Sequence, residues 1–233
     1  MYDYKFRIRQ RKRIFDYNLN RAIGFKDLSE SSILSDHKAD DPITPDELAR
    51  DLALFSLVAA VGSLDELMKS LYCDALIGYL TGDYCPLDRI RASIPIAAAR
   101  TLMDALARGD DIAVGLLPTL TQTAIMREYD RDNFQSASAI SGALRSLGGP
   151  KLKVCLRDYG PGNVPAAEAC SLFDRLAKSR HLVVHRLSVE SRSLEADTEV
   201  SNAREPVSGD ELEALKEIGN ALVGYFTARA VHG

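Results

Sequence analysis

The chain has 233 residues, of which 46% are hydrophobic and 27% are charged, and its formal net charge is −4. This composition is typical of a globular protein and excludes a disordered or fibrous chain. A protein that binds duplex DNA mainly by releasing counterions is usually far more basic, so any contact with nucleic acid must come from local basic clusters. No apolar run reaches the ~18 residues of a membrane span. The charged N-terminus is unlike a secretory signal, so we expect a cytoplasmic protein.

The first residues combine aromatic and basic side chains. Apolar residues alternate with charged ones at four positions: Tyr2, Tyr4, Phe6 and Ile8. This period of two is typical of a strand, and a basic run, Arg11-Lys12-Arg13, follows it. We therefore predict a short extended arm, with residues 1–43 forming an arm and loop ahead of a helical domain at 44–233. The basic run can contact phosphate, or it can be an ordinary solvated surface.

Two capping boxes mark the clearest helix starts, at Thr44-Pro45-Asp46-Glu47 and at Ser208-Gly209-Asp210-Glu211. Apolar residues at a spacing of three to four, and the Gly and Pro clusters between them, delimit the other helices. The predicted helices are 44–80 (one helix, or two joined near Gly62), 86–108 (interrupted or begun near Pro95), 118–128, 133–147, 165–187 and 208–230. Residues 151–159 are ambiguous, and loops are expected at 160–163 and 188–207. The pattern predicts an all-α bundle.

The helix at 165–187 carries the residues that are candidates for catalysis. On a helical wheel its apolar side chains form one stripe, and Arg180 falls in the middle of that stripe. A buried charge is costly unless it is paired, so the position needs an explanation. One explanation is an arginine side chain that bends out to water, and another is a structural ion pair. His181 and His185 lie one turn apart at the edge of the stripe. Arginine can grip a phosphate and histidine can move a proton near neutral pH, which together suit cleavage of RNA.

The segment from Arg180 to His185 resembles the R-x4-H signature of HEPN domains, with a polar residue after the arginine. The resemblance extends to the lead-in at 174–179, to residues 57–67 and to residues 133–149, and so spans about residues 45–190. Arg186 departs from the family pattern, in which a small residue is frequent after the histidine. The resemblance implies a HEPN-like helical bundle and a metal-independent endoribonuclease without a cofactor.

The resemblance also implies roles for individual residues. His185 would act as general acid or base, Arg180 would stabilise the charged phosphorane, and His181 would assist. Asp65 or Glu66 would be an acid that pairs with Arg180. We expect Lys178 and Arg186, together with Arg11, Lys12 and Arg13, to contact RNA. The expected partners are an RNA substrate, a second copy of the chain in a homodimer, and an antitoxin or defence-system protein.

Two other interpretations remain open. His181 and His185 have the i, i+4 spacing of zinc-binding histidines, but neither a glutamate base nor a third ligand is near them in the sequence. Cys73, Cys85, Cys155 and Cys170 form no C-x-x-C pair, and we interpret them as reduced thiols in the core. Some HEPN-like domains are helical dimers that only bind a protein partner, a nucleotide or RNA, and this is the main alternative to an enzyme.

Overall fold

The computed structural model describes residues 3–32, 44–93, 99–100, 103–104, 107, 133–188 and 207–231. This part of the chain contains six named helices: α1 (Tyr4–Ser29), α2 (Pro45–Thr81), α5 (Ala137–Ser146), α6 (Leu152–Tyr159), α7 (Ala166–Ser188) and α9 (Gly209–Ala228). Within it, β-pairing is limited to one isolated bridge between Tyr84 and Ala230. The prediction of an all-α chain is confirmed. No helix in the described ranges is both long and apolar enough to cross a membrane.

The predicted extended arm is wrong, because residues 4–29 form the helix α1. The carboxylate of Asp3 caps the helix by accepting a hydrogen bond from the backbone N of Phe6 at 2.8 Å. The alternation that suggested a strand ends at Ile8. The buried residues of the whole segment follow a helical spacing: Tyr4, Ile8, Phe15, Leu19 and Ala22. These side chains pack into the common core, and this burial outweighs the weak local signal at the N-terminus.

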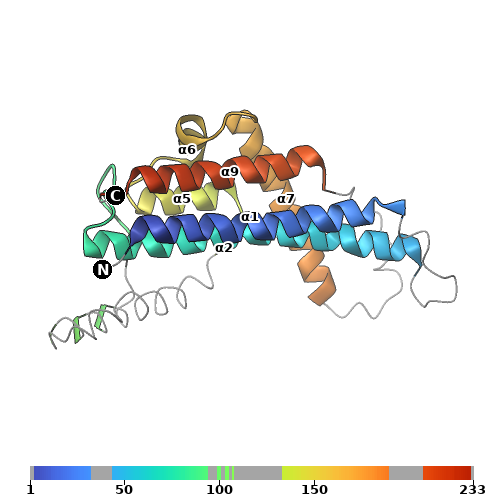
Figure 1. Ribbon diagram of the computed structural model, residues 1–233, viewed down its shortest axis with the longest axis horizontal. Helices are drawn as coiled ribbons and strands as arrows, with labels where there is room; N and C mark the ends of the chain where they lie inside the picture. The colour runs from blue at the N-terminus through green and yellow to red at the C-terminus, as the bar shows by residue number, and fades with distance from the viewer. Residues whose placement is uncertain are drawn as a thin grey trace.

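α1 and α2 lie side by side along most of their length and run in opposite directions, and α9 packs on both (Figure 1). Between α1 and α9 the contact is close, since a Cβ built on Gly219 would clash with the ring of Phe15. α7 crosses the bundle and contacts α2, α5, α6 and α9. The core therefore lies between the long pair α1 and α2 on one side and the later helices on the other.

The predicted helix boundaries agree closely where capping residues fix them. The capping boxes at Thr44 and Ser208 are both present, with the side chains of Glu47 and Glu211 closing them. α2 is a single helix of 37 residues, so Gly62 does not divide it, and it ends at Gly82, whose φ of 82° favours glycine.

Other predicted segments need adjustment. α5 begins after Ser136, which caps it, and so starts later than expected. The ambiguous segment at 151–159 is helical, as α6. Residues 86–93 are not helical, and a helix is present at 99–100, 103–104 and 107. The predicted helix at 118–128 and nearly all of the predicted loop at 188–207 lie outside the described residues.

Candidate functional site

Arg180 lies on the core face of α7, as the helical wheel predicts. Its neighbours along this face, Phe173, Leu176 and Val183, are all buried. Arg180 itself is half-buried, and its Nε atom is fully buried without a hydrogen-bond partner among the described residues. No ion pair of Arg180 is present among the described residues. A buried donor that makes no hydrogen bond lowers stability, and the Nε of Arg229 is in the same position within the part of the chain that the structure describes.

Two polar contacts fix α7 relative to its neighbours. The carboxylate of Asp174 accepts a hydrogen bond from the backbone N of Ala137, the first residue of α5, at 2.7 Å. The guanidinium of Arg175 lies 3.0 Å from the carboxylate of Glu211, the buried glutamate of the α9 capping box. Asp174, which precedes the R-x4-H motif on α7, thus holds the N-terminus of α5 beside α7. The sequence alone does not indicate these contacts, because they join residues about 37 positions apart.

A shallow hollow of about 540 Å³ lies between α7 and the segment that enters α5. One wall consists of Asn133, Gln135 and Ser136, and the other of four residues of α7: Ala177, Lys178, His181 and Leu182. Its volume is in the range of small-molecule sites, ~300–1,000 Å³. The hollow offers two amides, a hydroxyl, an ammonium group and an imidazole. Asn133, Gln135 and Ser136 were not singled out from the sequence, where only the capping role of Ser136 gives a local signal.

His181 and Lys178 are exposed at the rim of this hollow. His185 and Arg186 lie in the last turn of α7, and their side chains are outside the described part of the structure. Positions 181 and 185 are one helical turn apart, and position 180 is rotated by ~100° from position 181 toward the core. The helix therefore places the histidine positions at the surface edge of α7 and the arginine on its inner side.

The acids expected to pair with Arg180 have other partners. Asp65 accepts a hydrogen bond from the backbone N of Phe134 at 2.7 Å and lies 3.1 Å from the ammonium group of Lys69. The carboxylate of Glu66 accepts a hydrogen bond from the hydroxyl of Ser70 at 3.2 Å. Among the described residues, neither acid pairs with Arg180. Asp65 instead anchors the segment that enters α5 onto α2.

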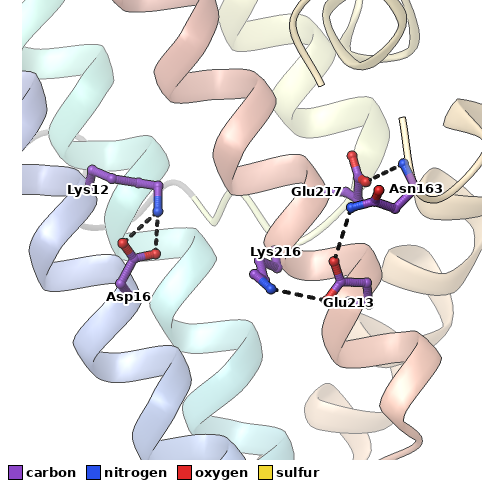
Figure 2. Close-up of polar contacts among 6 residues, drawn as sticks. All are labelled: Lys12, Asp16, Asn163, Glu213, Lys216 and Glu217. Atoms are coloured by element: carbon purple, nitrogen blue, oxygen red, sulfur yellow. Dashed lines mark hydrogen bonds and ion pairs between the residues drawn. The ribbon is translucent and has the colours of Figure 1, made fainter. Parts of the chain in front are cut away.

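Two of the three basic residues expected to contact RNA on α1 are engaged within the protein. The guanidinium of Arg11 lies 2.9 Å from the carboxylate of Asp74. Lys12 forms an ion pair with Asp16 one turn later on the same helix (Figure 2). Arg13 is exposed and makes no ion pair with a described residue. The basic run is therefore not a uniform phosphate-binding surface, because Arg11 and Lys12 point to acids of α2 and α1.

The cysteines and the candidate metal ligands do not form a metal centre in the described ranges. All four cysteines are free; Cys73 and Cys155 are buried, Cys170 is half-buried and Cys85 is exposed, so Cys85 is not the core thiol that was expected. Burial raises the pKa of Cys73 and of Cys155 to about 12. Within the part of the chain that the structure describes, no three His, Cys, Asp or Glu side chains gather in a metal-binding group. The side chain of His185 lies outside the described part of the structure.

Comparison with known proteins gives no match: no protein-family model matches the chain, and no curated protein and no solved structure is similar to it. The function therefore has to be argued from the site itself.

Proposed function

We propose that the chain is a metal-independent endoribonuclease of the HEPN type that acts in a defence or toxin–antitoxin setting. The observation that carries the proposal is the buried Nε of Arg180 on the core face of α7, which has no hydrogen-bond partner in the part of the chain that the structure describes. Planar guanidinium groups bind the oxygens of a phosphate with two parallel hydrogen bonds, and a phosphate would supply the missing partner. The hollow is lined by Lys178 and His181 but not by Arg180, and in this proposal the RNA strand enters it beside the motif.

The proposed reaction needs only proton transfer and charge stabilisation. The ribose 2′-oxygen attacks the adjacent phosphorus and gives up its proton to a base, and the bond to the 5′-oxygen of the next nucleotide breaks. The leaving oxygen takes up a proton, and a cyclic phosphate remains. In this proposal His185 is the general acid or base, His181 assists it, and Arg180 neutralises the charge that develops on the phosphorane.

A second copy of the chain is part of this proposal. Leu182 and Val184 of α7 are exposed to 52% and 38%. Apolar side chains on a helix that also carries the site suit an isologous contact, and two-fold dimers are the commonest oligomers. Such a contact would bring two copies of α7 together and double the number of catalytic groups.

The test is cleavage of single-stranded RNA in the presence of excess EDTA by the full chain and by its His185→Ala and Arg180→Ala variants. We expect cleavage by the parent protein and a loss of about 10²–10⁴-fold in each variant. Light scattering on the same samples should give a dimer for all three. Activity that requires a divalent ion would contradict the proposal and favour a metal held by His181 and His185.

The second candidate is a helical dimer without catalysis that binds a protein partner, a nucleotide or RNA. The exposed Leu182 and Val184 support it as well, because they suit a protein contact irrespective of chemistry. Parent protein that binds RNA or a partner but cleaves no RNA would favour this candidate over the enzyme.

A further inference from the structure

α1 has a solvent-facing stripe that contains both aromatic and basic side chains. The α1 stripe consists of Phe6, Arg9, Gln10, Arg13, Tyr17 and Arg21, all of which are exposed. At ~100° per residue these positions fall within about a third of the helix circumference. The opposite face of α1 is buried against α2 and α9, so packing within the described part of the chain does not explain the stripe.

The charge of α1 differs from that of the chain as a whole. Residues 4–29 contain eight basic residues and two acidic residues, Asp16 and Asp27, whereas the chain has a net charge of −4. Asp16 pairs with Lys12, off the stripe, and exposed Asp27 lies on the same face of the helix but beyond the last stripe residue. Among the described residues, Arg9, Arg13 and Arg21 make no ion pair. Three arginines thus present an uncompensated positive charge over about 18 Å of helix, which is complementary to a polyanion.

The aromatic rings of the stripe are unusually open to solvent. Phe6 and Tyr17 are exposed to 47% and 64%. The guanidinium of Arg21 lies over the ring of Tyr17, 6.0 Å from its centroid, which places a cation and a stacking surface side by side. Single-stranded nucleic acids offer the two matching groups, phosphates for the arginines and base faces for the rings.

We propose that the α1 stripe is a binding surface for single-stranded RNA, outside the hollow on α7. The choice of RNA among polyanions rests on the proposed function. None of the stripe residues lines that hollow, and α1 and α7 each pack on α2 and α9. The stripe extends the contact of the strand with the protein and contributes affinity without taking part in bond cleavage.

Other occupants fit the stripe less well. A helix that lies on a membrane needs a continuous apolar face, and the apolar face of α1 is already buried in the core. A second copy of α1 would bring arginines against arginines. An acidic protein would satisfy the arginines but provides no base to stack on Phe6 and Tyr17.

The experiment uses the full chain with His185→Ala, so that binding is measured whether or not the protein cleaves RNA. Fluorescence anisotropy of a labelled single-stranded RNA of mixed sequence gives the affinity at several salt concentrations. We expect Arg9→Gln/Arg13→Gln/Arg21→Gln to weaken binding at least about tenfold and to reduce the slope of log K against log salt by about 2. The matched control Lys151→Gln/Lys153→Gln/Arg157→Gln removes the same charge from exposed positions of α6 and its N-cap and should change the affinity by less than about twofold.

The aromatic residues separate base stacking from plain charge attraction. Phe6→Ala/Tyr17→Ala should weaken binding about tenfold while the salt slope stays unchanged. Far-UV circular dichroism checks that each variant keeps its helix content. Equal loss of affinity in the α6 control and the stripe variant would overturn the proposal. So would stripe variants that bind RNA normally but lose binding to phosphatidylserine vesicles or to polyglutamate, the probes for a lipid surface and an acidic peptide.

Discussion

The guanidinium of Arg11 lies 2.9 Å from the carboxylate of Asp74, and Asp74 is fully buried. This ion pair joins the first half of α1 to the second half of α2. Arg11, a residue of the N-terminal basic run, therefore makes a contact inside the protein. Removal of one member leaves the other charge buried with weaker compensation, which is usually more costly than the pair itself is stabilising.

We predict that Arg11→Ala lowers the free energy of unfolding by about 3 kcal/mol. Urea denaturation followed by circular dichroism measures this change. The double variant Arg11→Ala/Asp74→Ala should recover part of the loss, because it removes the orphaned carboxylate. A single variant as stable as the parent protein would show that Asp74 is satisfied by its other contacts.

Capping residues and apolar spacing are the features that made the helices predictable. Thr44 and Ser208 begin α2 and α9 because each side chain accepts a hydrogen bond from a backbone N–H three residues later, a local interaction that the sequence displays directly. The interpretation of α1 as an extended arm failed because alternation over a few residues is a weaker signal than burial of a whole helical face. That face was readable from the spacing of Ile8, Phe15 and Leu19.

Long-range polar contacts explain why the site was predicted only in part. The wheel correctly placed Arg180 on the apolar face of α7. It could not show that Asp65 binds the backbone of Phe134, or that Asp174 binds the backbone of Ala137, because these partners come together only in the folded chain. The hollow depends on both contacts, so its wall at residues 133–136 had no counterpart in the sequence interpretation.

Glu217 offers a second test of the fold. Its carboxylate is buried and accepts a hydrogen bond from the backbone N of Asn163 at 2.6 Å (Figure 2). It also accepts one from the backbone N of Gly162 at 3.3 Å, and so fixes the loop ahead of α7. We predict that Glu217→Gln lowers the free energy of unfolding by about 1–2 kcal/mol, since the amide N cannot accept a hydrogen bond. Chemical denaturation measures the effect.

A control for Glu217 lies one turn earlier on α9. The carboxylate of Glu213 lies 3.3 Å from the ammonium group of Lys216 and accepts a 3.5 Å hydrogen bond from the Nδ2 atom of Asn163 (Figure 2). Glu213→Gln should change stability by less than about 0.5 kcal/mol. Equal effects of the two substitutions would mean that the loop does not depend on the buried carboxylate.

The buried thiols predict a loss of stability at alkaline pH. Burial raises the pKa of Cys73 and Cys155 to about 12, whereas an unfolded cysteine titrates near ~8.5. The contribution of these two thiols to the free energy of unfolding is therefore fully present below about pH 8.5. It is lost as pH rises toward 12, because in that range the thiols ionise only in the unfolded chain. We expect the free energy of unfolding to fall by about 1–2 kcal/mol per thiol between pH 8 and pH 10.

Thiol reactivity checks the same burial independently. With a thiol reagent such as dithionitrobenzoate at pH 8, exposed Cys85 should react at once, while Cys73 and Cys155 should react only after denaturation. Cys155→Ala should show a smaller fall in stability between pH 8 and pH 10 than the parent protein. Rapid modification of all four cysteines in the native state would disprove this account.

Arg180 links stability to the proposed function. Its Nε is buried without a partner among the described residues, on the α7 face that also carries the buried Phe173, Leu176 and Val183. Arg180→Met keeps an unbranched apolar stem and removes the buried polar group. We predict that thermal and urea unfolding give a stability equal to the parent protein or higher by about 1 kcal/mol, while cleavage of RNA falls about 10²–10³-fold.

The control for Arg180 is Arg175 on the same helix, which pairs with buried Glu211. Arg175→Met should have the opposite effects, a loss of about 1 kcal/mol in stability with cleavage retained. A residue that holds the fold together lowers stability when it is removed, whereas a residue kept for a ligand leaves stability unchanged or raises it. If Arg180→Met instead lost several kcal/mol and Arg175→Met did not, Arg180 would be a structural residue of α7, and its proposed role at the phosphate would have to be withdrawn.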